Sequence, residues 1–172
     1  MAKVQGRFIL MIDSMVSGQA QRKARTAMKI PIADLQPEEW YDFQSTLLLY
    51  EQAIIDGYGG PIGLKMAGTR IMPTLKKQTA QLDGFTNPRA LFEALNDLYL
   101  SNNTGPDVGY LKAVETTDDS VVIEDTSPHL PELELGLAEG IVKVFPGCFL
   151  TSSEILERSE AKRVYRLTWK SR

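Results

Sequence analysis

The chain has 172 residues, of which 43% are hydrophobic and 24% are charged, with a formal net charge of −3 at pH 7. These values are typical of a soluble globular protein that buries a hydrophobic core without needing disulfide bonds or a structural metal. The acidic balance argues against a protein that follows nucleic-acid phosphates, because such binding needs a clustered basic face. The short basic run at 21–29 is interpreted as the solvated side of a helix.

The chain contains one cysteine, Cys148, and one histidine, His129. An internal disulfide and a histidine-based zinc cage are therefore excluded, and no metal is expected. The longest uninterrupted apolar run, Phe8–Ile12, is far shorter than the roughly 20 residues of a membrane span. The first residues also lack the pattern of a signal peptide. These features predict a cytoplasmic protein with no membrane span.

The first 60 residues are expected to be mainly helical. The apolar stretch Gly6–Val16 is interpreted either as a strand or as a first helix, because its spacing fits neither period cleanly. The polar segment Gln19–Met28 is read as an exposed helix. A long buried helix is predicted from Pro37 to Tyr58, since proline suits a first helical position and apolar residues recur every three or four positions. Its predicted end is a group of glycines: Gly57, Gly59 and Gly60.

Three further helical segments are expected before residue 105. The first runs from Pro61 to Ile71, and the second covers Thr74–Leu82 after a restart at Pro73. The third is capped by Asn87 and directs an apolar stripe inward as far as Tyr99.

From Val108 onward the apolar period changes from about four to two. Val108–Thr116 and Ser120–Asp125 are predicted to form a hairpin, and Pro128–Phe145 a helix. A second hairpin is expected to pair Phe149–Leu156 with Arg163–Trp169.

The predicted fold class is α+β, with a helical N-terminal half followed by ββαββ and an antiparallel sheet that helices cover on one face. The second hairpin is expected to turn at Arg158–Ala161. No linker divides the sequence, so residues 1–172 are expected to form a single domain. Residues 1–30 are interpreted as an N-terminal extension, a candidate segment for dimer or partner contacts.

Three stretches together resemble one superfamily: PEEWYDFQSTLLLYEQAIIDGYGGPIGLKMAGTRI, LFEALNDLYLSNNTG and VVIEDTSPHLPELELGLAEGIVKVFPG with its final hairpin. Their order is similar to that of the 4-vinyl-reductase-type (V4R) domain. Its relatives are the haem nitric oxide/oxygen-binding (H-NOX) domains and the small subunits of the TRAPP vesicle-tethering complex. The resemblance covers Gln36–Trp169. It implies the same α+β fold and a cargo that is haem, an acyl chain, a small hydrocarbon or only another protein.

The residues that the resemblance requires for haem are mostly replaced. The proximal histidine of H-NOX domains corresponds to a position near Tyr99, and their Tyr-x-Ser-x-Arg motif falls on 125–129 with only Ser127 kept. Asp125 would repel the propionates, and His129 lacks the fork of a guanidinium. V4R domains often carry cysteines in the final hairpin, and these are missing. We therefore expect a degenerate member of the superfamily, with no cofactor and with haem disfavoured.

Several polar residues have two interpretations. Cys148 is read as a small residue facing the core rather than as a reactive or acylated thiol. His129 is read as a loop residue rather than a catalyst, and Asp13 either caps a helix or marks an interface. Three carboxylates on the Pro128–Phe145 helix are read as solvated rather than as acid or base groups. They are Glu132, Glu134 and Glu139.

The function expected from the sequence is non-enzymatic binding or sensing of a small apolar molecule, acting through a protein partner. The alternative is an adaptor that uses the same fold with no ligand. No catalytic residue is assigned. A homodimer is expected, and the apolar stretch Phe8–Met15, expected to be exposed, is the candidate for the dimer or partner surface. The candidates for lining a ligand pocket are Trp40, Phe43, Leu47, Met66, Phe92, Tyr99 and Phe145.

Overall fold

The computed structural model describes residues 1–57, 60–159 and 161–172. Tyr58 and Gly59, at the predicted helix end, and Glu160, in the predicted turn, lie outside the described residues. The N-terminal elements are β1 (Lys3–Gln5), α1 (Gly6–Met15), α2 (Gly18–Ala27), a 3-10 helix (Ile32–Asp34), β2 (Trp40–Asp42) and α3 (Leu47–Gly57). The central elements are α4 (Pro61–Gln78), α5 (Pro88–Glu93), α6 (Leu95–Asn102) and β3 (Asn103–Thr104). The C-terminal elements are β4 (Leu111–Thr116), β5 (Ser120–Asp125), α7 (Pro131–Lys143), β6 (Cys148–Arg158) and β7 (Arg163–Ser171).

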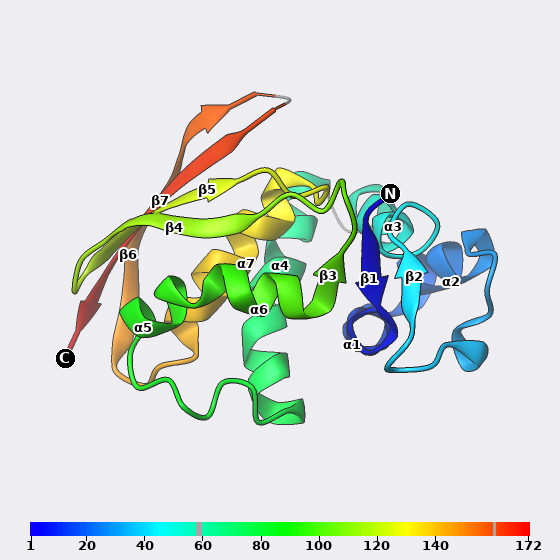
Figure 1. The fold of residues 1–172 in the computed structure, drawn as a ribbon, viewed down its shortest axis with the longest axis horizontal. Coiled ribbons are helices and arrows are strands. Elements are labelled where there is room, and N and C mark those ends of the chain that lie inside the picture. The colour runs from blue at the N-terminus through cyan, green and yellow to red at the C-terminus, as the bar shows by residue number, and fades with distance from the viewer. Residues whose placement is uncertain (58–59, 160) are drawn as a thin grey trace.

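The predicted α+β class and its ββαββ C-terminal half are confirmed. Four antiparallel strands form a sheet in the order β4-β5-β7-β6. A smaller sheet in the order β2-β1-β3, which the sequence did not predict, joins the N-terminal layer to the end of α6. Figure 1 shows the four-stranded sheet with α4 to α7 on one side of the molecule and β1, α1, α2 and α3 on the other. In β7 the predicted alternation buries Tyr165, Leu167 and Trp169 on one face.

The apolar stretch near the N-terminus is a helix, α1, preceded by the short strand β1. The prediction that Phe8–Met15 forms an exposed surface is wrong. Phe8, Ile9 and Ile12 are buried, because α1 packs between the other helices and contributes its apolar side to the core. The apolar side of α1 is therefore not available as a dimer or partner surface.

The long helix predicted from Pro37 is wrong in its first ten residues. Trp40–Asp42 form β2, which pairs with β1, and the helix α3 begins only at Leu47. The Asp42 carboxylate accepts a hydrogen bond from the Ser45 amide at 2.9 Å. A local side-chain bond of this kind competes with helix formation, and strand pairing supplies the remaining partners.

The predicted restart at Pro73 is also wrong, since α4 runs unbroken from Pro61 to Gln78 with Pro73 inside it. A proline in a helix removes one hydrogen bond and is normally costly. Here α4 lies tightly against α7. A Cβ on Gly68 would stand 2.3 Å from the Leu133 carbonyl oxygen, and one on Gly136 would stand 2.1 Å from that of Lys65. Packing along this backbone contact keeps α4 continuous.

Within the described ranges, no helix combines the length and the apolar character that crossing a membrane requires.

Candidate functional site

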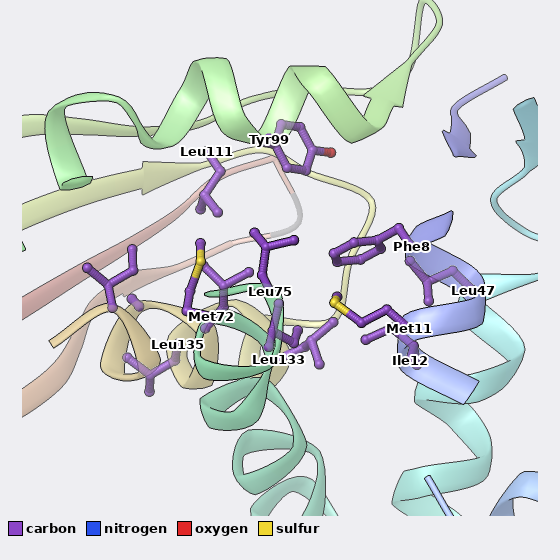
Figure 2. Packing of buried hydrophobic residues seen from close by; sticks show 14 of the residues in the cluster. Phe8, Met11, Ile12, Leu47, Met72, Leu75, Tyr99, Leu111, Leu133 and Leu135 are labelled. Carbon is purple, nitrogen blue, oxygen red and sulfur yellow. The ribbon is translucent and has the colours of Figure 1, made fainter. Parts of the chain in front are cut away.

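An interior cavity of about 30 Å³ lies where the N-terminal layer meets the helices under the sheet. Its walls come from α1, α4, α6, β4 and α7, and most are apolar. Figure 2 shows Phe8 of α1 extending toward Leu75 of α4, with Tyr99 and Leu111 above them in this view. The volume accommodates roughly two water molecules. The polar residues that line it are Tyr99, Asn102, Asn103, His129 and Glu134.

One wall of the interior cavity carries buried charge. The imidazole Nδ1 of His129 lies 2.6 Å from the Glu51 carboxylate, and the second oxygen of Glu51 accepts the Leu130 amide at 2.8 Å. The His129 Nε2 lies 3.8 Å from a carboxylate oxygen of Glu134. Because only 3% or less of each of these three side chains is exposed, the charges interact with little screening. We call Glu51, His129 and Glu134, with Asp125 and Arg163, the buried cluster.

The second half of the buried cluster belongs to the sheet. Arg163 Nε on β7 donates to Asp125 at 2.9 Å, and its Nη2 donates to the Ser127 carbonyl at 2.6 Å. The Tyr165 hydroxyl donates to the same Asp125 oxygen at 2.9 Å. Asp125 also accepts the Ser127 amide at 2.7 Å. The cluster therefore connects α3, the loop before α7, α7 itself and two strands.

Burial and mutual charge set the protonation of the buried cluster. Burial alone would lower the pKa of His129, but Glu51 and then Glu134 outweigh it and raise that pKa to about 9. Burial raises the pKa of the Glu134 carboxyl, and His129 only partly offsets this. Burial, followed by the charge of Glu134, also raises the pKa of the Tyr99 phenol. At neutral pH His129 is an imidazolium and Tyr99 is a neutral phenol.

One oxygen of the buried cluster has no partner. Glu134 Oε1 accepts the Ser127 hydroxyl at 3.3 Å, but Glu134 Oε2 is buried without a hydrogen-bond partner among the described residues. A buried polar atom left unpaired costs roughly 1 to 3 kcal/mol. Since Glu134 lines the interior cavity, its free oxygen is a polar group that a guest molecule would satisfy.

The seven residues predicted to line one pocket are not brought together. Tyr99 lines the interior cavity, and the Phe43 ring packs edge-on against His129 with centroids 4.8 Å apart. Leu47 and Phe145 are buried in the core, and Phe92 stacks on Trp169. Two members lie elsewhere, at the surface: Trp40 is 39% exposed on β2, and Met66 is 57% exposed on α4.

Four of the polar residues weighed from the sequence also have clear positions. Of the α7 carboxylates, Glu132 pairs with Arg158 at the surface, but Glu134 and Glu139 are buried, so the solvated interpretation is wrong for those two. Glu139 is held by Lys65 of α4 at 2.7 Å. Asp13 is buried too, where it pairs with Arg25 and accepts the Tyr50 hydroxyl.

Cys148 is half-buried at the start of β6, with its sulfur 3.4 Å from the Ser171 hydroxyl. No group of three histidine, cysteine or acidic side chains suited to a metal occurs in the part of the chain that the structure describes.

Glu51 is the functional candidate that the sequence interpretation missed. It lies in LLLYEQAII, where a carboxylate within an apolar run must find a partner or reach water. That signal marks Glu51 as unusual but does not name its partner, which is 78 residues away.

No family model matches the chain, and no curated protein matches it. Solved structures do match. An oxygen-binding H-NOX domain described as related to soluble guanylate cyclases has a TM-score of 0.74 at 16% identity, over 96% of this chain and 93% of that one. An unliganded Fe(II) H-NOX protein from K. algicida has a TM-score of 0.69 at 12% identity, over 98% and 97%. A structure concerned with haem redox potential and porphyrin distortion has a TM-score of 0.71 at 16% identity, over 95% and 96%.

These matches correct the expectation that no cofactor belongs here and that haem is disfavoured. The expectation against haem rested on the replaced motif residues. However, a structure concerned with haem redox potential shares this fold over nearly the whole chain. Replaced motif residues therefore do not remove the cofactor from consideration.

The described side chains, as they are arranged here, do not fit a haem. The interior cavity is about 30 Å³, while pockets for cofactors span roughly 300 to 1,000 Å³. The imidazolium of His129 has no free lone pair for iron, and the phenol of Tyr99 donates to the Val108 carbonyl at 2.6 Å. At such low identity the likeness concerns the fold alone: this chain has the fold of H-NOX domains, built around an interior in which paired charges occupy one wall of a small cavity.

Proposed function

We propose that this chain is a non-enzymatic sensor domain that binds a small, mostly apolar molecule in the interior cavity and acts on a separate protein. The observation that carries the proposal is the unpartnered Oε2 of Glu134 in a residue that lines an otherwise largely apolar cavity. Such an arrangement gives a guest apolar contacts on most sides and one fixed hydrogen bond.

The size and charge of the interior cavity define the ligand class. A volume of about 30 Å³ suits a molecule of a few heavy atoms. Burial raises the pKa of Glu134 to about 7, so near neutral pH this group accepts a hydrogen bond as a carboxylate and also donates one when protonated. The proposed ligand is therefore neutral and carries a single hydrogen-bonding atom.

The buried cluster supplies a route from the interior cavity to the rest of the molecule. Glu134 on α7 faces His129, and His129 is held by Glu51 on α3. A ligand that engages Glu134 changes the charge balance around His129 and so the attachment of α3 to the helices under the sheet. A shift between the two layers is the proposed output, read by a partner protein.

Two features of the comparisons support this proposal. One matching domain is described as oxygen binding, which is the scale of ligand that the interior cavity accommodates, and the same domain is described as related to soluble guanylate cyclases. The V4R-like assignment, the homodimer and the cytoplasmic location belong to the proposal as predictions from the sequence. Native mass spectrometry of the purified chain reports the oligomeric state directly.

Ethanol is the probe that tests the interior site, with methyl NMR as the readout. In the unaltered chain, ethanol should shift the methyl signals of Met72, Leu75 and Leu133, which surround the interior cavity. Leu75→Phe fills the space and should abolish these shifts. The matched control is Leu156→Phe on β6, where the side chain is 43% exposed, and it should leave them unchanged.

The proposal is overturned if ethanol shifts no interior methyl group in the unaltered chain, or if the shifts survive in Leu75→Phe. A visible absorption scan of the same sample tests for bound haem. A stoichiometric haem band would also overturn the proposed occupant, because a porphyrin requires the interior cavity to be rebuilt. If neither ethanol nor haem binds, the result favours an adaptor function that uses this fold without a ligand.

A further inference from the structure

We infer a second ligand site on the outside of the N-terminal layer, specific for an amphiphilic anion with one carboxylate and an apolar tail. A pocket of about 300 Å³ lies between the C-terminal end of α1, α3 and α4, about ten times the volume of the interior cavity. We call it the outer pocket. Six of the residues that line it are Met15, Val16, Ile54, Met66, Ala67 and Arg70.

The outer pocket has the size and lining of a small-molecule site. Its volume reaches the lower bound of ligand pockets, which is roughly 300 Å³. Its walls come from three helices, so their backbone positions are fixed by the core. Met66 leaves 57% of its surface exposed there, and a flexible thioether of this kind adapts to the shape of an apolar tail.

Arg70 sets the charge of the ligand. Most other guanidinium groups among the described residues are held by carboxylates, such as Arg25 by Asp13 and Arg163 by Asp125. Arg22 on α2 and Arg172, over the Phe149 ring, are not, but neither lines the outer pocket. Within the described residues, Arg70 has neither a hydrogen bond nor an ion pair. An unpaired guanidinium beside an apolar wall matches a carboxylate, which it binds through two parallel hydrogen bonds.

A cationic or neutral amphiphile lacks this match. The tail alone gains only contact with Met66 and its neighbours, and an ammonium group would be repelled by Arg70. The outer pocket is therefore expected to discriminate by headgroup charge, with tail length as a second determinant.

The outer pocket shares two helices with the interior cavity. On α1, Met15 borders the outer pocket and Phe8 the interior cavity, about 10 Å apart along the helix axis. On α4, Arg70 and Ile71 are neighbours in sequence that face the two different spaces. Occupation of the outer pocket would alter the α1–α4 contact that forms a wall of the interior cavity. The outer site itself does not depend on the proposed interior ligand.

Octanoate tests the outer pocket by calorimetry and methionine-methyl NMR, with octylamine, octanol and acetate as comparison probes. Octanoate is expected to bind most tightly and to shift Met15 and Met66. Arg70→Gln should weaken octanoate at least tenfold and leave octanol unchanged. The matched control is Arg22→Gln on the exposed side of α2, which should leave both affinities unchanged.

Equal binding of octylamine and octanoate would overturn the inference, as would an unchanged octanoate affinity in Arg70→Gln. Ala67→Phe, which fills the outer pocket, should abolish binding of octanoate and octanol together. Arg70 is at the surface, so its substitution keeps the test valid even if the Ala67 variant does not fold. Met72 reports the interior cavity separately, so failure at one site is distinguished from failure at the other.

Discussion

The charge arrangement beside the interior cavity depends on one residue, His129. It lies between Glu51 and Glu134, in a region where water cannot screen any of the three charges. Removing one partner from such a group leaves an uncompensated buried charge, whereas breaking an exposed ion pair changes little. The buried cluster is therefore expected to respond to pH and to substitution in ways that the surface pairs do not.

A proton NMR titration should show that the imidazole of His129 titrates near pH 9. The chain has a single histidine, so its ring signal is unambiguous. The pKa is raised to about 9 because the carboxylates of Glu51 and Glu134 outweigh burial. Glu51→Gln removes one of these charges and should lower the midpoint by roughly 1 to 3 pH units. A midpoint near 6.5 in the unaltered chain would contradict the geometry.

The free energy of unfolding should fall as the pH rises from about 6.5 to 9. The folded pKa of His129 is raised above its unfolded value, so its contribution is complete below the unfolded pKa of about 6.5 and is lost as the pH passes the folded value. The loss is roughly 3 kcal/mol. Glu134, whose pKa is also raised, acts in the same direction at lower pH. Urea unfolding across this range measures the slope, and a smaller slope is expected in Glu51→Gln.

At the scale of elements, α4 and α7 are in direct backbone contact. Gly68 and Gly136 let the two backbones meet, because a Cβ at either position would overlap a carbonyl oxygen of the other helix. This contact also orients Glu134, which follows Leu133 on the same turn of α7. The position of the buried cluster therefore depends on two residues that have no side chain.

Gly136→Ala should destabilise the protein by roughly 1 to 3 kcal/mol, because the added methyl group forces α4 and α7 apart. Urea unfolding measures the change. Gly84→Ala is the control, since a Cβ there meets no atom within 4 Å, and it should change stability by less than about 0.5 kcal/mol. Equal effects of the two substitutions would show that α4 and α7 can move apart without loss of stability.

At the scale of the whole molecule, the buried cluster holds two layers together. Glu51 belongs to the N-terminal layer, while His129, Glu134 and Arg163 belong to the layer with the four-stranded sheet (Figure 1). The two layers share one core, so a change at their connection should be detected on both sides.

Glu51→Gln should therefore raise amide hydrogen exchange in α3 and also in residues 126–143, measured by mass spectrometry. The start of β6, Cys148–Ser152, pairs with the end of β7 away from Arg163 and should be unaffected. Lys23→Gln removes an exposed ion pair with Asp56 on the same helix α3 and serves as the control. Increased exchange restricted to α3 would argue against coupling between the layers.

The sequence alone determined the elements whose signals are local. The two hairpins and the helix between them follow from a change of apolar period, and Asn87 caps its helix as expected, accepting the Ala90 amide at 2.9 Å. Trp40 and Pro73 were misassigned because pairing with β1 and packing on α7 overrode the local pattern. Those outcomes depend on segments that are distant in the chain.

Only the tertiary structure decided the candidate sites. Glu51 and His129 are 78 residues apart, and no periodicity links a buried carboxylate to a partner at such a distance. Likewise, Arg70 and Met15 border one pocket only because α1 crosses α4. Local patterns report which side of an element is apolar. The pairing of buried charges and the location of cavities depend on how those elements pack, which is a property of the whole fold.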